Sequence, residues 1–507
     1  REDSMRESYK RHPIEFDIEL GASKEGIFKS LRVQAYLDGG AYTNMSPPVA
    51  YKTATLGSGP YRYDDVDYKA TAVLTNNVHT GSMRGFGTPQ ALFALENTID
   101  ELAEELGMSP ADIRRKNVLV NGDTSPNGHV LDFHEVSIKE VLEKALAEID
   151  YDRKYAQYKE ENKDPKRRIR RGVGVAVSIR GASVGADGNG FDVARILIEV
   201  MKDGSVHANL GLVEIGQGLR TAQMQMVAEG MGVSFDQVTM GETDTSRSPA
   251  TGACIASRGT LLGGGATRDA CNRIHEILIQ GLKLEYGEDI GQVVFEADRV
   301  SFDDKDLSFK EVVSIAYGHN LTPMAVGTYS VPVTDWDEEK GFGEPFYTYT
   351  YSCNAVEVEV DLDVGSVEVI QMVGSHDPGR AINPTLLKGQ VWGGLAMSQG
   401  MALLEDIGHN PETTVLKNQN FSGYLLPTVL DVPDNNVPIF TENPDPRAAF
   451  GGRSMGEPSL EPGMPALTCA VHMALGKAGM INELPFDLDR VFAAAQELWG
   501  DDDVEIS

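Results

Sequence analysis

The sequence predicts an α+β fold with mixed sheets and packed helices. Runs with two-residue alternation, which are typical of strands, occur along the chain together with amphipathic helical segments. No internal repeat at a fixed period is present. The length of 507 residues predicts two to four domains with a large core.

The expected strands are bounded by glycine-rich or proline-containing turns. Gly39-Gly40 closes the first strand region, and Asp203-Gly204 is typical of a hairpin turn. The clearest alternation is Ala355-Val-Glu-Val-Glu-Val-Asp-Leu, followed by a turn at 363–365. In chain order, strands are expected at 31–36, 68–75, 171–179, 193–200, 206–212, 235–242 and 347–373.

The expected helices carry recognisable start and stop signals. Thr88 is a predicted N-cap with Pro89 at the first helical position, and Gly107 ends that helix. Asn383 is likewise a predicted N-cap with Pro384 at the first helical position, and Gly230 is predicted to end the helix at 221–229. In chain order, helices are expected at 89–106, 110–117, 137–149, 221–229, 260–283, 384–405 and 465–475.

A dense run of charges at 159–171 indicates a solvated linker and is the best candidate domain boundary. We therefore expect a first domain at 1–125, a helical and charged linker at 126–170, and a second domain at 171–507.

The charge balance is strongly acidic, with 76 acidic against 45 basic residues and a net charge of −31. Nucleic acid is not expected as a partner, because phosphate binding needs a basic face. An anionic membrane surface is disfavoured for the same reason, and no run of 18 apolar residues is present. The acidity fits either adaptation to high salt in a halophilic cell or a mildly acidic enzyme surface.

The four cysteines, Cys254, Cys271, Cys353 and Cys469, lie far apart and form no CxxC pair. A zinc or iron–sulfur site within this chain is therefore not expected. This cysteine usage fits a reducing compartment, so we expect a cytoplasmic protein.

Four loops of glycine and small residues each lead into a helix, at 81–90, 213–221, 252–260 and 451–466. Helix N-termini present unpaired N–H groups, and glycines let a ligand approach them closely. Several such ends together would hold a large anionic cofactor. None of the loops matches a P-loop or a GxGxxG motif at a βαβ start.

The last of these loops holds one central carboxylate, Glu457, between Gly456 and Pro458. Proline restrains Glu457 toward extended geometry, so the acid sits on a stiff turn. Taken alone, the loop is more typical of a turn that leads into a helix and carries an incidental acid near the positive end of the dipole.

Taken together, the loops resemble the xanthine oxidase/aldehyde oxidase family. The motifs are Arg84-Gly-Phe-Gly-Thr-Pro-Gln90, Glu214-Ile-Gly-Gln-Gly218, Gly379-Arg-Ala-Ile-Asn-Pro384 with Gln390, and Gly456-Glu-Pro458, in the family's order. The resemblance extends from about residue 11 nearly to the C-terminus. It implies two elongated molybdenum-cofactor-binding domains, the first truncated at its N-terminus.

The resemblance also implies a xanthine dehydrogenase-like molybdenum hydroxylase. Such an enzyme places a water-derived oxygen on an electron-poor carbon of an aldehyde or N-heteroaromatic. The implied cofactor is molybdenum–molybdopterin, in bacteria often the cytosine dinucleotide. Iron–sulfur clusters and FAD are expected only on partner subunits of a hetero-oligomer, and a further chain would supply the missing N-terminal part.

By its position in the motifs, Glu457 matches the family's general base, for which a buried carboxylate with a raised pKa is expected. No side chain is expected to bind the metal directly, and the lone His376 is interpreted as structural. The cofactor-binding positions implied by the resemblance are Arg84, Gly85, Gly216, Gln217, Gly218, Ala253, Cys254, Ser257, Gln390 and Arg453.

The implied substrate-binding residues are Phe86, through its ring face, and Lys52. A core phenylalanine is the alternative for Phe86. Lys52 stands where purine-oxidising members have an arginine, and it lacks the bidentate fork. The region 181–190 offers no second aromatic ring, so xanthine is a doubtful substrate.

Two other functions remain open at this point. The chain could be a non-catalytic cofactor-binding or assembly half-subunit of a split molybdenum enzyme, because the implied site is incomplete without the N-terminal part. The hypothesis of an acidic sugar- or nucleotide-binding protein is supported only by the glycine loops and the net charge.

Overall fold

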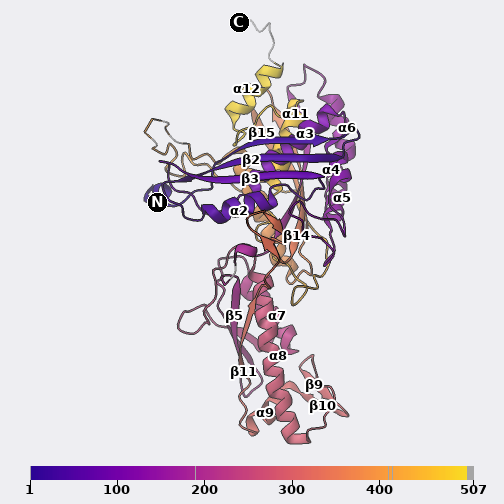
Figure 1. The fold of residues 1–507 in the computed structure, drawn as a ribbon, viewed down its shortest axis with the longest axis vertical. Coiled ribbons are helices and arrows are strands. Elements are labelled where there is room, and N and C mark those ends of the chain that lie inside the picture. The colour runs from indigo at the N-terminus through magenta and orange to yellow at the C-terminus, as the bar shows by residue number, and fades with distance from the viewer. Residues whose placement is uncertain (1, 189, 409, 411, 414, 500–507) are drawn as a thin grey trace.

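The computed structural model describes residues 2–188, 190–408, 410, 412–413 and 415–499. Figure 1 shows an elongated molecule with a broad body and a narrower arm. The body is built from the two ends of the sequence, and the arm from the middle of the chain, residues 193–330. This mixed arrangement confirms the predicted α+β class with mixed sheets.

The first sheet of the body has β2 at its centre. Its strands are β1 (Ile14–Ala22), β2 (Phe28–Gly40) and β3 (Asp65–Leu74). β1 pairs with β2 antiparallel and β3 pairs with β2 parallel. Along β2, alternate residues from Leu31 to Leu37 are buried, as the period of two predicts.

The second sheet of the body has the order β16-β15-β14-β4. Its strands are β4 (Ile169–Gly181), β14 (Tyr349–Asp361), β15 (Ser366–Asp377) and β16 (Asn436–Phe440). β14 pairs antiparallel with both β4 and β15, and β16 runs parallel to β15. The pairing of β4 with β14 joins the segment that precedes the arm in the sequence to the segment that follows it.

Helices cover both sheets of the body (Figure 1). They are α2 (Ser46–Leu56), α3 (Thr88–Glu105), α4 (Pro110–Asn117), α5 (Ile138–Ile149), α6 (Tyr151–Glu161), α10 (Pro384–Leu403), α11 (Gly463–Leu475) and α12 (Leu488–Trp499). The short helix α1 (Glu2–Glu7) has no buried residue. α11 lies very close to β4. A Cβ at Gly172 would lie 1.9 Å from Ala470 O, and one at Gly174 would lie 2.1 Å from Ala466 O. Glycine is therefore required there.

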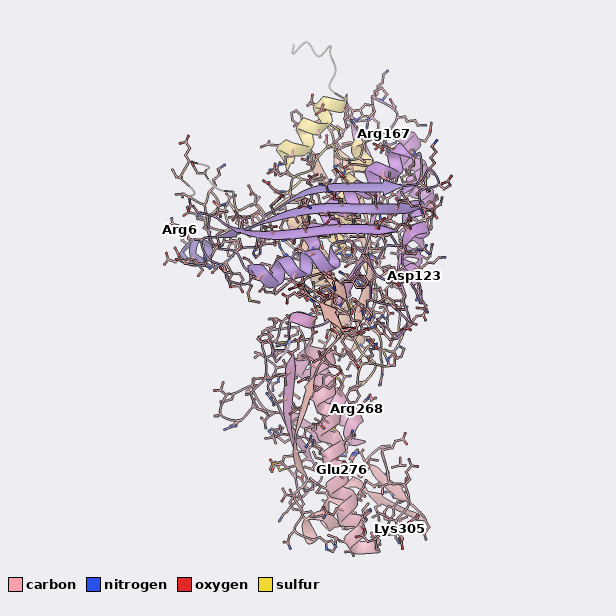
Figure 2. The ribbon with its side chains drawn as sticks, viewed as in Figure 1. Arg6, Asp123, Arg167, Arg268, Glu276 and Lys305 are labelled. Carbon is pink, nitrogen blue, oxygen red and sulfur yellow. The ribbon has the colours of Figure 1, made fainter. Side chains whose placement is uncertain are left out.

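The arm has its own apolar core, formed by the sheet β11-β5-β6-β7 and three helices. Its main elements are β5 (Val193–Val200), β6 (Val206–Leu210), β7 (Val238–Met240), β11 (Met324–Ser330), α7 (Leu219–Met231), α8 (Gly259–Tyr286) and α9 (Phe309–Gly318). Figure 2 shows Arg268 and Glu276 along α8, with Lys305 near the far end of the arm.

Short elements complete the fold. They are β8 (Val294–Glu296), β9 (Arg299–Phe302), β10 (Lys305–Ser308), β12 (Trp336–Asp337), β13 (Phe342–Gly343) and the 3₁₀ turns η1 (Ala186–Gly188) and η2 (Phe235–Gln237). Within the part of the chain that the structure describes, no helix combines the length and apolar character needed to cross a bilayer.

Most predicted elements are present, with differences at their ends. Thr88 is the first residue of α3 rather than its cap, because Gly87 takes the cap position with a φ of 90°. α7 continues to Met231 and ends at the left-handed Gly232, not at Gly230. The charged run is not fully solvated, since Arg170 is buried and stacks 3.7 Å from the Trp499 ring.

Candidate functional site

The candidate site is centred on Glu457, in the loop that precedes α11. This side chain is 6% exposed. Its Oε1 accepts a hydrogen bond from the Gly85 N–H (3.2 Å), and its Oε2 accepts from the Ser257 hydroxyl (2.9 Å) and Arg180 Nη2 (2.6 Å). The Glu457 N–H in turn donates to Ser257 Oγ at 2.9 Å. Three segments that are distant in sequence therefore meet at one carboxylate.

Arg180, at the end of β4, is a residue that the sequence reasoning missed. Its side chain is 1% exposed, and it forms ion pairs with Glu457 and Glu461. Its Nη1 also donates to the Gly85 carbonyl at 2.8 Å. The sequence carries one signal for its role: Arg180 ends a nearly apolar strand, and a buried cation needs a buried partner.

The expectation of a raised pKa for Glu457 is wrong. Burial raises the pKa of this carboxyl, but the Arg180 guanidinium and then the Lys52 ammonium outweigh burial. Hydrogen bonds from Ser257 and Gly85 act in the same direction, so the pKa of Glu457 lies below its ordinary value. Glu457 is therefore ionised at neutral pH.

A second buried carboxylate, Glu461, shares Arg180 with Glu457. Arg180 Nη1 donates to Glu461 Oε1 at 2.8 Å, and the Ser178 hydroxyl donates to Oε2 at 2.7 Å. Burial raises the pKa of Glu461 to about 7, although the Arg180 guanidinium opposes this shift. The sequence reasoning missed Glu461 as well, because it lies in an apolar stretch just before α11.

The sheet face beneath this loop is polar. Arg180 lies opposite Thr350 in the register of β4 and β14, and Ser178 lies opposite Ser352. Ser352 in turn lies opposite His376 of β15. Burial lowers the pKa of His376 to about 3, so its ring is neutral. No group of three or more His, Cys, Asp or Glu side chains that could hold a metal occurs among the described residues.

Arg84 joins the Glu457 loop to α10. Its Nε donates to the Gly456 carbonyl, and its Nη2 donates to Ser459 Oγ at 2.7 Å. The same Nη2 lies 3.2 Å from the Gln390 carbonyl and 3.5 Å from its side-chain Oε1. The predicted cofactor-binding residues Arg84 and Gln390 are therefore brought together beside Glu457.

Lys52, on α2, lies inside the protein next to the site. Its Nζ donates to the Ser183 carbonyl at 2.7 Å and sits 3.9 Å from the centre of the Phe346 ring. The side chain is buried, and burial holds the pKa of Lys52 well below its usual range. A substrate-binding role for Lys52 remains a prediction.

The loop before α7 brings Gln217 close to Cys254. Gln217 Nε2 lies 3.5 Å from Cys254 Sγ, and burial raises the pKa of that thiol. The N–H groups of Gly216 and Gly218 donate to Glu214 Oε1 at 2.7 and 3.0 Å. Glu214 thus occupies these N–H groups, and their predicted cofactor contact remains a prediction.

The segment from Ala253 to Ser257 is locally strained. Ala256 and Ser257 have φ angles of 55° and 48°, in the left-handed region that is unfavourable for side chains with a Cβ. Arg258 anchors the segment by donating to the Ala253 carbonyl (2.8 Å) and pairing with Asp192 (2.6 Å). The strained turn places the Ser257 hydroxyl against Glu457.

Phe86 and Arg453 make no contact with Glu457 that the structure describes. The Phe86 ring is 5% exposed and packs in a core cluster with Ala35, Leu37 and Val49. Arg453 is buried, pairs with Asp377 at 2.9 Å and donates to the Asn443 carbonyl at 3.2 Å. Both residues are placed as structural groups, and their predicted roles at a ligand remain predictions.

The groups around Glu457 fit the anionic, acceptor-rich cofactor that the resemblance implies. The described hydrogen bonds of the Arg84 guanidinium go only to neutral acceptors. Arg11 Nη1 is buried without a partner among the described residues. A Cβ at Gly393 would meet only Arg84 Nη1 (3.9 Å), and one at Gly456 only Ser257 Oγ (3.2 Å). An Arg84 nitrogen beside open space and an unpaired Arg11 nitrogen suit phosphate and pterin oxygens.

Comparison with known proteins agrees with a molybdopterin-type cofactor at this site. The family model described as the molybdopterin cofactor-binding domain matches residues 144–433, and a second model of the same description matches residues 1–118. The chain is 28% identical over 500 residues to the xanthine dehydrogenase molybdenum-binding subunit of Escherichia coli O157:H7. That alignment covers 97% of this chain and 63% of the relative, so the chain spans less than two thirds of the relative's length.

Solved structures show the same fold. The aldehyde oxidoreductase from Desulfovibrio desulfuricans ATCC 27774 aligns with a TM-score of 0.82 and 26% identity, over 97% of this chain and 50% of that one. Quinoline 2-oxidoreductase from Pseudomonas putida 86 aligns with a TM-score of 0.86 and 25% identity, over 98% of this chain and 64% of that one. Because one family model alone covers more than half of the chain, the resemblance is confirmed: the chain belongs to the molybdopterin cofactor-binding domain family of xanthine dehydrogenase and aldehyde oxidoreductase-type proteins.

Proposed function

We propose that this chain carries the base and part of the cofactor site of a molybdenum hydroxylase that oxidises an electron-poor carbon of an aldehyde or N-heteroaromatic. One observation carries the proposal: Glu457 is ionised, buried and joined by hydrogen bonds to the loops at Gly85 and Ser257. A carboxylate fixed in this way is a suitable proton acceptor. The reaction class is supported by the similarity to a xanthine dehydrogenase subunit, an aldehyde oxidoreductase and a quinoline 2-oxidoreductase.

The loops around Glu457 supply the groups that would hold the cofactor. Arg84 contacts Gln390, and Gln217, from the loop before α7, contacts Cys254 on the segment that ends at Ser257. When bound, molybdenum–molybdopterin supplies a redox-active metal at which a water-derived oxygen passes to the substrate carbon and two electrons are collected. The donors of this chain orient the cofactor and need no metal–side-chain bond.

Glu457 would take up one proton at Oε1 or Oε2 as the substrate is oxidised. Ser257 and Gly85 fix the direction of the carboxylate, which removes the entropic cost of orienting a free side chain. Arg180 keeps the acid ionised before each turnover, at the expense of basicity. Burial excludes bulk water from the acceptor atoms.

Electron-transfer partners belong to the same proposal. We propose an iron–sulfur subunit and an FAD subunit as electron-transfer partners, since no cysteine cluster occurs in this sequence. The cytosine dinucleotide form of the pterin and a cytoplasmic location are also proposed.

The test uses the purified complex. We expect molybdenum in the wild-type complex and turnover with an aldehyde or N-heteroaromatic panel that includes xanthine. Glu457→Gln keeps the shape of the side chain and should lower kcat about 10²–10⁴-fold with the metal content unchanged. Glu368→Gln, on the exposed side of β15, is the matched control and should leave kcat unchanged. Full turnover of the Glu457→Gln complex would exclude the catalytic role and favour a cofactor-binding or assembly subunit.

A further inference from the structure

We propose that Arg180 and Glu461 form a charge couple that positions Glu457 and sets how readily it accepts a proton. This inference rests on the proposed function of Glu457. One guanidinium bridges the two carboxylates, with 2.6 Å from Nη2 to Glu457 Oε2 and 2.8 Å from Nη1 to Glu461 Oε1. Nothing in the motifs of the family resemblance singled out either partner.

The bridge is held rigidly on the Arg180 side. Arg180 Nη1 also donates to the Gly85 carbonyl at 2.8 Å and lies 3.2 Å from Thr88 Oγ1. Gly85 in turn donates its N–H to Glu457. The guanidinium therefore cannot move with one carboxylate without losing its hydrogen bond to the other. The bridge is specific to arginine because it needs a planar fork of donors.

The charges around the couple decide where a proton resides. Glu461 faces Arg180 and Ser178 from β4, Lys52 from α2 and Glu457 from its own loop. Arg84 also interacts electrostatically with both carboxylates from the loop before α3. Burial raises the pKa of Glu461 to about 7, whereas Glu457 stays below its ordinary value. The two acids thus titrate as a coupled pair, with the neutral-pH step mainly at Glu461.

The direction of the effect follows from Coulomb attraction. Below about pH 7 Glu461 is protonated, so the charge of Arg180 acts on Glu457 alone and makes it a weaker base. Above that pH the ionised Glu461 competes for Arg180, and its negative charge raises the proton affinity of Glu457. Turnover should therefore rise as the pH increases through about 7.

Three variants of the holoenzyme complex test the couple through the pH profile of kcat. Glu461→Gln should abolish the rise near pH 7 and lower the plateau about tenfold, the effect of roughly one pKa unit lost from the base. Ser178→Ala removes a hydrogen bond to the ionised form and should move the rise to higher pH. Arg180→Lys keeps a cation but loses the fork, so it should lower kcat more than it raises KM. Ser375→Ala, a buried β15 serine without a described partner, is the control and should match the wild type.

A second readout does not depend on turnover. Infrared difference spectra of the purified chain across pH 5–9 should show a protonated-carboxyl band that disappears near pH 7 and is missing in Glu461→Gln. The couple is excluded if Glu461→Gln retains both this band and the wild-type pH profile. If Glu457→Gln instead turns over fully while the band behaves as expected, the proposed function fails and the charge couple stands as a structural feature.

Discussion

Gly85 connects the chemistry of the site to backbone geometry, and Gly85→Ala tests that connection. Gly85 has a φ of 95°, and a Cβ there would lie 2.4 Å from Cγ of Pro89. The proline ring is rigid and lies in the first turn of α3, so the loop rather than the ring would have to move. The unfavourable φ costs about 1–2 kcal/mol, and the overlap adds about 1–3 kcal/mol.

The expected loss in free energy of unfolding is therefore about 2–5 kcal/mol, measured by urea denaturation with fluorescence and circular dichroism. Gly122→Ala is the matched control, because Gly122 has a φ of 83° and a Cβ there would meet no atom within 4 Å. It should lose only the backbone contribution of about 1–2 kcal/mol. If Gly85→Ala is no more destabilising than Gly122→Ala, the argument from close approach to Pro89 is wrong.

Three further predictions concern other parts of the chain. Arg114→Met leaves the buried Glu96 without its cation at 2.8 Å and should lower the free energy of unfolding by about 3–5 kcal/mol, measured by urea denaturation. Phe86→Ala should lower it by about 3–5 kcal/mol as well, because the ring is 5% exposed; a higher KM with unchanged stability would instead indicate substrate contact. At Glu214 burial raises the pKa, but the N–H groups of Arg220, Gly218 and Gly216 outweigh it, so the folded-state pKa is lowered. The wild type should therefore lose this stabilisation as the pH falls below about 4.5, and Glu214→Gln should show a flatter dependence of Tm on pH over that range.

Much of the fold could be predicted from sequence because its signals are local. The alternation in β14 and the Pro89 and Pro384 helix starts depend only on neighbouring residues. The loops at Gly85, Ser257 and Glu457 could be expected to converge because the family resemblance implies that all three lie at one cofactor site. These are the parts of the site that the structure brings together.

Arg180 and Glu461 could not be predicted, because their contact depends on long-range pairing. The whole arm separates β4 from β14 in the sequence, and no local pattern encodes the register in which the two strands pair. The lowered pKa of Glu457 was missed for the same reason, since its main cause is the Arg180 guanidinium. The motif predicts substrate contact for Phe86, whereas the burial of its ring depends on packing against β2 and α2.

The separate core of the arm has a consequence for how the site loses its order. A unit with its own apolar core can open as an independent cooperative block, and hydrogen exchange would detect such a block as a common protection level for β5, β6 and α8. Ser257 lies where this block meets the body, so its opening would withdraw both hydrogen bonds between Ser257 and Glu457 and leave the Arg180 bridge intact. Glu457 would then remain ionised, but its carboxylate would be held only by Gly85 and Arg180 and would be less firmly oriented. The first sign of partial unfolding would be misalignment of the base rather than loss of its charge.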